Sequence, residues 1–191
     1  MSDHYLFDHT FSKTDFTEQP PEQGEYERCT FISCILTHAD LSRCRFIDCR
    51  FEQCSLSMMR MRDTVWNECS FDDCKMLGLR WDECSASGLS LSFKNCQLDH
   101  SVFYKLKLPG TTFNSCRLLQ CDFSETDLSG CIFSGSDLSD ALFDRTKLDK
   151  ADFRCANNYR IHPERNSIKK ARFSYDGITG LLSSYDIRID P

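Results

Sequence analysis

The sequence predicts an all-β protein whose chain winds as a four-sided coil, and three observations lead to this fold class. Large apolar residues recur at every fifth position, small residues stand two positions before them, and glycines gather two positions after them. A period of five fits neither an α-helix, with about 3.6 residues per turn, nor the alternation of a β-strand. The 191 residues suit one elongated array of such units.

The large residues form two runs, from Tyr26 to Trp81 and from Phe93 to Phe153. A two-residue insertion near Leu89 and Ser90 places both runs in one register of four columns, in which like residues fall on like. The columns are Phe31, Phe51, Phe71, Phe93, Phe113, Phe133, Phe153; Leu36, Leu56, Met76, Leu98, Leu118, Leu138; Leu41, Met61, Trp81, Phe103, Phe123, Phe143; and Phe46, Trp66, Ala86, Leu108, Leu128, Leu148. Stacked columns of this kind bury a core that no single coil could bury alone.

The small positions hold twelve of the 13 cysteines, and Cys155 is the exception. One inner column contains Cys34, Cys54, Cys74, Cys96 and Cys116. Side chains that run parallel about 4.8 Å apart suit neither a disulfide, whose Cβ atoms approach to about 4 Å, nor a tetrahedral zinc site. We therefore expect free, buried thiols that pack the core, no metal and no cofactor. So many unpaired thiols favour a reducing compartment, the cytoplasm.

The glycines test the turn independently. Gly78, Gly88, Gly110, Gly130 and Gly135 all lie two positions after a central position of the repeat, which is large in every case except Ala86 before Gly88. Glycine is the residue that most readily adopts a positive φ, as a tight turn requires. A turn in every five residues closes a four-sided coil after twenty residues.

The unit resembles the pentapeptide repeat family, in which a small residue, Asp or Asn, Leu or Phe and two polar residues recur. Segments such as Ala39-Asp40-Leu41-Ser42-Arg43 and Ser136-Asp137-Leu138-Ser139-Asp140 carry the resemblance. It implies a right-handed quadrilateral β-helix over residues 29–155. Residues 1–28 are then an imperfect N-terminal coil or cap, interrupted around Pro20 and Pro21, and residues 156–191 are a C-terminal module.

The C-terminal module has a different periodicity. Ser174 is a suitable N-cap for a short helix over 174–184, and the alternation of Ile187 and Ile189 predicts a strand after it. The resemblance implies that this module joins two chains head to head as a homodimer. The apolar residues expected at that interface are Ile178, Leu181, Leu182, Ile187 and Ile189.

No catalytic motif stands out. The sequence holds neither a Gly-x-Ser-x-Gly nucleophile elbow nor a phosphate-binding glycine loop, and His38 and His100 fall at surface corners. We therefore expect no enzyme. No run of about 18 apolar residues predicts a membrane span, and the net charge of −6 does not favour direct binding of nucleic acid.

The charge is uneven along the chain. Residues 118–144 hold acidic residues without a single Lys or Arg. These candidate partner-binding residues are Asp122, Glu125, Asp127, Asp137, Asp140 and Asp144, which we call the acidic cluster. A solvated face is the simple alternative for such a run, because surface charge often serves only solubility.

Three segments look like the Qnr quinolone-resistance and albicidin-resistance group within this family: residues 74–78, 101–104 and 168–174. That resemblance implies a dimeric, acidic rod that mimics DNA and binds DNA gyrase or topoisomerase IV. A departure is the break at 82–92, which adds only two residues where many Qnr proteins carry longer loops. The alternative is a general protein-interaction scaffold with another partner.

Overall fold

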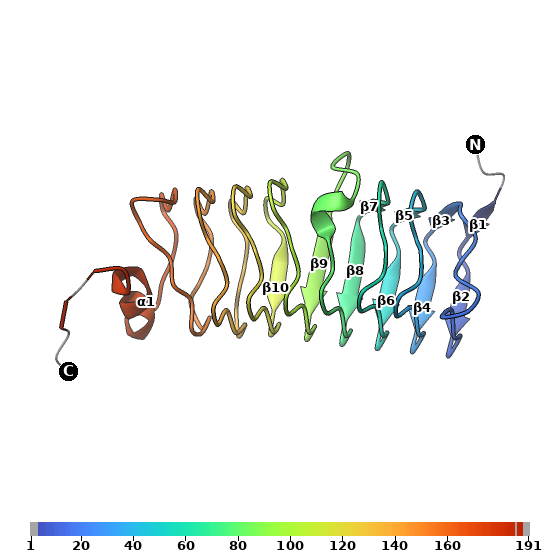
Figure 1. Ribbon diagram of the computed structural model, residues 1–191, viewed down its shortest axis with the longest axis horizontal. Coiled ribbons are helices and arrows are strands. Elements are labelled where there is room, and N and C mark those ends of the chain that lie inside the picture. The colour runs from blue at the N-terminus through green and yellow to red at the C-terminus, as the bar shows by residue number, and fades with distance from the viewer. Residues whose placement is uncertain (1–3, 186, 189–191) are drawn as a thin grey trace.

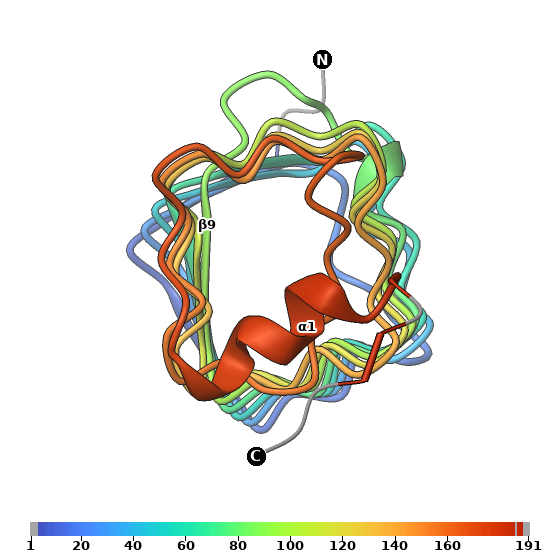
Figure 2. The same ribbon diagram turned by 90° about the vertical axis from the view of Figure 1, so that its left-hand side faces the viewer.

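The computed structural model describes residues 4–185 and 187–188 and shows a straight rod of stacked coils (Figure 1). Seen along its axis, the rod is four-sided (Figure 2). In that view the chain passes from Trp81–Glu83 at the right, over the top, to β9 at the left while it advances toward the viewer, so the coil is right-handed. The predicted quadrilateral β-helix is confirmed.

The regular elements are short. The strands are β1 (Tyr5–Phe7), β2 (Thr10–Ser12), β3 (Glu25–Glu27), β4 (Thr30–Ile32), β5 (Arg45–Ile47), β6 (Arg50–Glu52), β7 (Val65–Asn67), β8 (Cys69–Asp72), β9 (Leu91–Lys94) and β10 (Thr112–Asn114). The helices are the 3-10 turns η1 (Trp81–Glu83) and η2 (Asp176–Ile178) and the α-helix α1 (Thr179–Leu182).

The strands form two parallel sheets on two sides of the rod, in the orders β1-β3-β5-β7 and β10-β9-β8-β6-β4-β2. Tyr5 pairs with Glu25 and Thr10 with Thr30, so one coil takes twenty residues. Between β8 and β9 the partner of Cys69 is Leu91, which confirms the two-residue insertion. Beyond Asn114 the described coils are joined by single-residue bridges, such as Asp127 with Lys147 and Asp152 with Arg172. The coil therefore continues to Arg172.

The core is a set of ring stacks. Phe113 is fully buried, and its ring lies 5.1 Å from those of Phe93 and Phe133 at angles of 13° and 2°. The same stacking continues from end to end through Phe11, Phe31, Phe51, Phe71, Phe93, Phe113, Phe133, Phe153 and Phe173. Each coil thus covers the apolar edge of the coil before it.

One predicted core position is wrong. The register predicts Ala86 in the fourth column, but Ala86 is exposed, and the half-buried Leu89 packs against the core instead. The extra residues leave the wall as a projecting loop (Figures 1 and 2), which the amide of Asn67 fastens by donating to the carbonyl of Gly88 at 2.8 Å. This loop accommodates the two additional residues, and from it the short methyl side chain of Ala86 does not reach the core of the rod.

The corners have the predicted left-handed backbone. Gly78, Gly88, Gly110, Gly130 and Gly135 have φ between 66° and 74°. The same position in other units holds non-glycine residues with positive φ, for example Gln53 at 55° and Gln120 at 54°. Each such residue costs roughly 1–2 kcal/mol, so the cooperative ladder of the coils must offset this strain.

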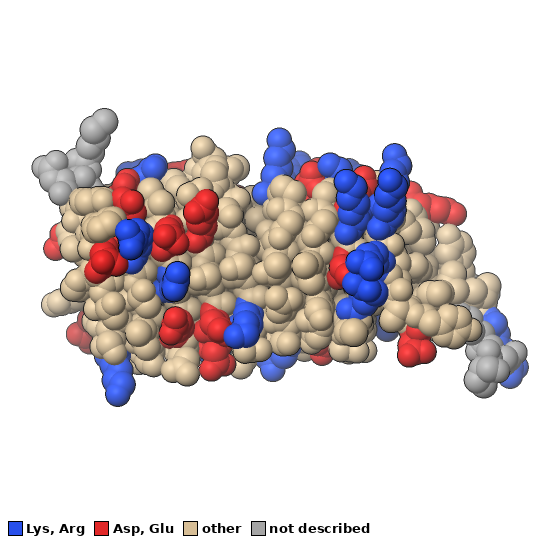
Figure 3. Space-filling model, turned by 180° about the vertical axis from the view of Figure 1, so that it is seen from behind, with Lys and Arg blue, Asp and Glu red and all other residues tan. Residues whose placement is uncertain are grey.

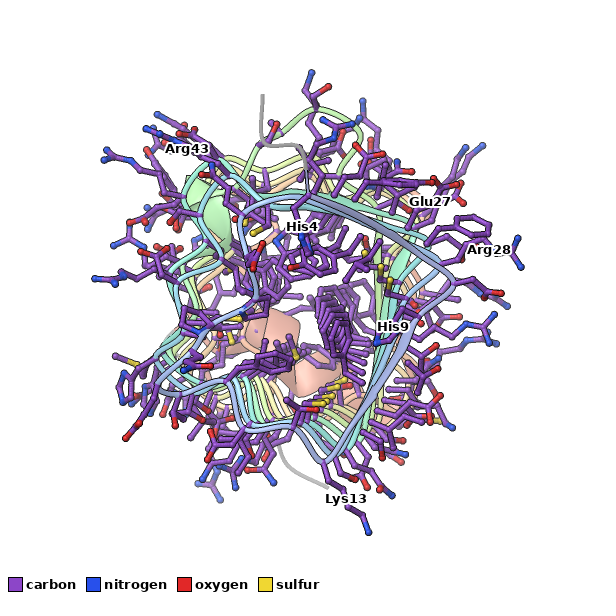
Figure 4. All side chains as sticks on the ribbon, turned by 90° about the vertical axis from the view of Figure 1, so that its right-hand side faces the viewer. His4, His9, Lys13, Glu27, Arg28 and Arg43 are labelled. Atoms are coloured by element: carbon purple, nitrogen blue, oxygen red, sulfur yellow. The ribbon has the colours of Figure 1, made fainter. Side chains whose placement is uncertain are left out.

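The N-terminal end is closed by aromatic and imidazole rings. The ring of His9 lies 4.6 Å from that of Phe11, and the ring of His4 lies 5.6 Å from that of Tyr26. Figure 4 shows both histidines directed inward, whereas Lys13 and Arg28 point outward. The first coil is therefore a real coil whose open end is partly shielded.

The C-terminal helix is shorter than expected. Residues 176–182 are helical as η2 and α1, and no side chain caps either element, so Ser174 is not the predicted N-cap. Gly177 and Gly180 allow the close approach, because an added Cβ would stand 2.1 Å from the Tyr159 hydroxyl and 2.3 Å from the Tyr159 carbonyl. The glycines that weaken this helix are thus required for docking it. Ile187 is not in a strand, and Ile189 lies outside the described residues.

Candidate protein-binding surface

The acidic cluster lies on three sides of the C-terminal coils. Asp122 and Asp144 flank the third column, Glu125 stands at the following corner, and its amide donates to the carbonyl of Asp144 at 2.8 Å. Asp137 and Asp140 belong to the second side, and Asp127 belongs to the fourth. The fold therefore brings Asp122, Glu125 and Asp144 together and leaves Asp127 around a corner from them.

Basic residues from neighbouring coils neutralise half of the cluster. Glu125 pairs with Lys105 at 3.4 Å and with Arg145 at 2.9 Å. Asp144 pairs with Arg165 at 2.6 Å and with Arg145 at 3.3 Å, and Asp127 pairs with Lys147 at 3.0 Å. These partners lie outside the stretch without Lys or Arg. Because one coil takes twenty residues, a search of the sequence for basic residues twenty positions before or after each acidic residue would have found most of these partners.

Asp122, Asp137 and Asp140 make no ion pair with another described residue. Asp122 accepts the amide hydrogen of Ser124 at 2.8 Å, and Asp137 accepts that of Ser139 at 3.1 Å. Partial burial pushes the pKa of Asp137 upward, but hydrogen bonds from Asn158 and Ser139 outweigh it and hold the pKa below its usual range. Asp122 and Asp137 are half-buried and Asp140 is exposed, so a basic partner can reach all three carboxylates.

An ion pair that the sequence did not indicate lies on the second side, between the buried carboxylate of Asp99 and the half-exposed side chain of Arg117. Asp99 is only 4% exposed, although this position usually faces solvent. Its carboxylate accepts from the guanidinium of Arg117, with Nε at 2.7 Å, and from the amide of Leu119 at 3.2 Å. This pair fastens neighbouring coils together and serves the structure.

The thiols follow the prediction. The twelve cysteines at the small positions are buried, and Cys155 is exposed. The Sγ of Cys131 donates to the carbonyl of Leu108 at 3.0 Å, and burial raises the pKa of this thiol to about 12. In the long column, the backbone amides of Cys34 and Cys54 each donate to the next Sγ at 3.4 Å. The thiols act as small, hydrogen-bonded core residues.

An open hollow of about 680 Å³ lies between the last coil and the C-terminal helix and is lined by residues such as Cys155, Asn158 and Thr179. Within residues 4–185 and 187–188, no three His, Cys, Asp or Glu side chains are grouped so that they could bind a metal. None of the described helices is long and apolar enough to cross a membrane.

The residues expected at a dimer interface have mixed positions. Ile178 and Ile187 are 41% and 56% exposed, whereas Leu181 is half-buried against the core and Leu182 is half-buried. Ile189 lies outside the described residues. Part of this apolar set is thus used within the chain, and part faces solvent at the C-terminal end.

The regular coil of five-residue units, with its stacked core and charged sides, defines a solenoid protein. The chain belongs to the pentapeptide repeat family: the model for the pentapeptide repeat region matches residues 25–103 and 80–153. This family is generally non-catalytic. No curated relative matches the chain.

Two solved structures support the same fold, and a third is less similar. One trypsin-treated variant of QnrB1, described as a plasmid-mediated fluoroquinolone resistance protein, is 18% identical, with a TM-score of 0.63 and 97% of each chain covered. A second trypsin-treated variant of QnrB1 is also 18% identical, with a TM-score of 0.53 and coverage of 98% and 99%. HetL from Nostoc sp. strain PCC 7120 is 16% identical, with a TM-score of 0.44 and coverage of 88% and 84%. At these identities the likeness concerns the fold.

Proposed function

We propose that this protein is a non-enzymatic rod that binds a type II topoisomerase through the acidic cluster and competes with DNA for the enzyme. The observation that carries the proposal is the set of accessible carboxylates of Asp122, Asp137 and Asp140, which make no ion pair with a described residue, on two adjacent sides of a straight rod. A groove built for phosphates presents Lys and Arg, which such carboxylates can engage. The likeness to QnrB1, a fluoroquinolone resistance protein, agrees with this partner.

The ion pairs of Glu125, Asp127 and Asp144 favour a second candidate. Their charges are balanced by Lys105, Arg145, Lys147 and Arg165, so the local charge is much lower than the acidic residues alone suggest. Duplex DNA carries one negative charge per about 1.7 Å of its axis, and this surface is far less charged. A protein-interaction scaffold with a different partner requires no such density.

The test is gyrase supercoiling, with and without a quinolone, in the presence of the parent or the variant D122N/E125Q/D137N/D140N. Asparagine keeps the oxygen that accepts the Ser124 and Ser139 amide hydrogens, so the coil should persist. The matched control, E52Q/D63N/E68Q/D73N, removes four exposed carboxylates from the N-terminal coils.

We expect the parent to alter supercoiling or drug sensitivity, the first variant to lose most of this effect, and the control to keep it. The effect should also weaken steeply with salt, because the screening length falls from about 10 Å at 0.1 M to about 3 Å at 1 M. A parent without effect on gyrase would favour the scaffold. Equal effects of the two variants would exclude the acidic cluster as the binding surface.

We also propose a homodimer joined at the C-terminal ends and located in the cytoplasm. Exposed Ile178 and Ile187 support the interface, and the unpaired buried thiols support a reducing compartment. Sedimentation of full-length protein should give a dimer, and I178D/I187D should give a monomer with the same circular dichroism spectrum. A parent that sediments as a monomer at micromolar concentration would contradict the dimer.

A further inference from the structure

The net charge of −6 conceals a basic surface along the fourth side of the C-terminal coils, the side on which Asp127 of the acidic cluster also lies. We call it the lysine patch, and its members are Lys107, Lys147, Lys150, Lys169 and Lys170, all exposed. Figure 3 shows Lys and Arg side chains gathered toward the C-terminal end along the upper edge of the rod, whereas both signs mix at the N-terminal end. Lys147 pairs with Asp127 of the acidic cluster, and the other four lysines belong neither to that cluster nor to the expected dimer interface.

The register places these lysines in adjacent columns. Asp127 forms backbone β-bridges with Lys107 in the preceding coil and with Lys147 in the following coil. Lys147 forms the next β-bridge, with Ser167. The amide of Lys150 donates to the carbonyl of Lys169 at 2.8 Å, and Lys150 and Lys170 occupy equivalent corners with φ of 62° and 59°. The coils therefore align lysines that are 19 or more residues apart in the sequence, such as Lys150 and Lys169.

Two carboxylates lie among the five lysines. A hydrogen bond from Ser167 lowers the pKa of one of them, Asp149, and the charges of Lys169 and Lys147 help to lower it. Asp127 pairs with Lys147 at 3.0 Å, and Asp149 accepts hydrogen bonds from the Ser167 hydroxyl at 2.6 Å and the Lys169 amide at 3.0 Å. Lys107, Lys150, Lys169 and Lys170 make no ion pair with any described residue. Arg154 and Arg172 adjoin the patch and share Asp152, at 2.7 and 3.7 Å.

The residue types in the lysine patch indicate which class of partner it can bind. Protein interfaces are depleted in Lys and depend on aromatic or Arg anchors, and the lysine columns hold no aromatic residue between Lys107 and Lys170 on that side. Single-stranded nucleic acid needs aromatic side chains for base stacking. Exposed lysines on flexible stems, without base-reading groups, suit the phosphates of a duplex.

We propose that the lysine patch binds the phosphate backbone of duplex DNA without sequence preference. The columns span three coil spacings of about 4.8 Å, or roughly 14 Å, which is the length of duplex that carries about eight phosphates. Four unpaired lysines would release about four counterions, so log Kobs should fall against log salt with a slope of about −3 to −4. Affinity should then drop by about 100-fold between 50 and 200 mM salt.

The inference is independent of the proposed topoisomerase partner, because its test contains no enzyme. Full-length protein is titrated into a fluorescent duplex of random sequence at 50, 100 and 200 mM salt. The variant K150Q/K169Q/K170Q is compared with K13Q/K75Q/K94Q, which removes the same charge from exposed lysines of the N-terminal coils. Glutamine occurs natively at corners equivalent to those of Lys13, Lys150 and Lys170, as in Gln53 and Gln120, and Lys75, Lys94 and Lys169 are exposed, so both variants should fold.

We expect the parent to bind at 50 mM salt, the patch variant to lose at least tenfold in affinity and the control to change less than threefold. Equal losses in both variants would show a general charge effect and overturn the proposal. Absence of binding by the parent at 50 mM salt would also overturn it, as would tighter binding to vesicles of anionic lipid than to the duplex. The patch variant should also accompany the supercoiling test, because a protein that sequesters DNA would inhibit gyrase without contacting it.

Discussion

The coils before and after Asn114 stack on their neighbours through different backbone pairing. In the N-terminal coils, two sides are strands of three or four residues, whereas the C-terminal coils have single-residue bridges. No strand carries Asp at the position just before its central large residue, but Asp122, Asp127, Asp137 and Asp152 hold that position after Asn114. Their carboxylates accept the amide hydrogen two residues later at 2.8–3.1 Å.

This difference bears on function. A local bond from an Asp side chain to the backbone competes with regular strand structure and stabilises a turn. The acidic residues of the C-terminal coils therefore have a structural role as well as a charge. Their abundance alone does not identify a binding surface, and the variants proposed above replace Asp by Asn for that reason.

The largest expected effect is in the core that both regions share. Phe113→Ala should lower the free energy of unfolding by about 3–5 kcal/mol, because it removes a fully buried ring between two stacked neighbours. Denaturant titration followed by circular dichroism measures this loss. Ser134→Ala, an exposed change in the next coil, should stay within about 0.5 kcal/mol. Equal midpoints for parent and Phe113→Ala would contradict the stacked core.

A smaller effect should separate the two regions. Asp137→Ala should cost about 1–3 kcal/mol, because the Ser139 amide and hydroxyl and the Asn158 amide lose their acceptor. Asp137→Asn, which retains an oxygen, should cost less, and Asp73→Ala at an exposed N-terminal corner should cost almost nothing. If Asp73→Ala and Asp137→Ala are equally mild, the local bonds do not stabilise the C-terminal coils.

Acid should weaken the same bonds. A hydrogen bond from Arg154 lowers the pKa of Asp152. Burial acts to raise the pKa of Asp127, but hydrogen bonds from Ser129 and Lys147 outweigh this effect, so the pKa of Asp127 is also lowered. Because the folded pKa lies below the unfolded value near 3.9, this stability is present above about pH 4 and is lost as pH falls through the folded pKa. Thermal unfolding of D127N/D137N/D152N between pH 5 and 2 should show a flatter decline than the parent. A parallel decline would contradict these shifts.

A backbone effect of about 1 kcal/mol is expected at the corners. Gly110 has φ of 74° and no atom within 4 Å of an added Cβ, so Gly110→Ala tests the left-handed backbone without a clash. It should destabilise by about 1 kcal/mol, and Gln120→Gly at an equivalent corner should stabilise by a similar or smaller amount. Chemical denaturation measures both, and changes of the same sign would contradict the expected corner strain.

The thiols should differ in reactivity with little effect on stability. Cys155 is exposed and Cys131 is buried with a raised pKa, and thiolate is the reactive form. A thiol reagent should label one site per native chain, none in Cys155→Ser, and thirteen in denaturant for the parent. Rapid native labelling of several sites in Cys155→Ser would show that the core opens.

The sequence alone determined the repeat, the four columns, the buried thiols and the corner backbone. With a period of five, the spacing of Phe, Leu, Cys and Gly shows which positions of every coil face inward and which face outward. Only the tertiary structure decided which charges meet. Glu125 with Arg145, Asp144 with Arg165 and Lys150 beside Lys170 are about twenty residues apart, so composition along the chain could not show pairing or patches. The loop that expels Ala86 and the docking of Gly177 on Tyr159 likewise depend on contacts between coils, which no local pattern encodes.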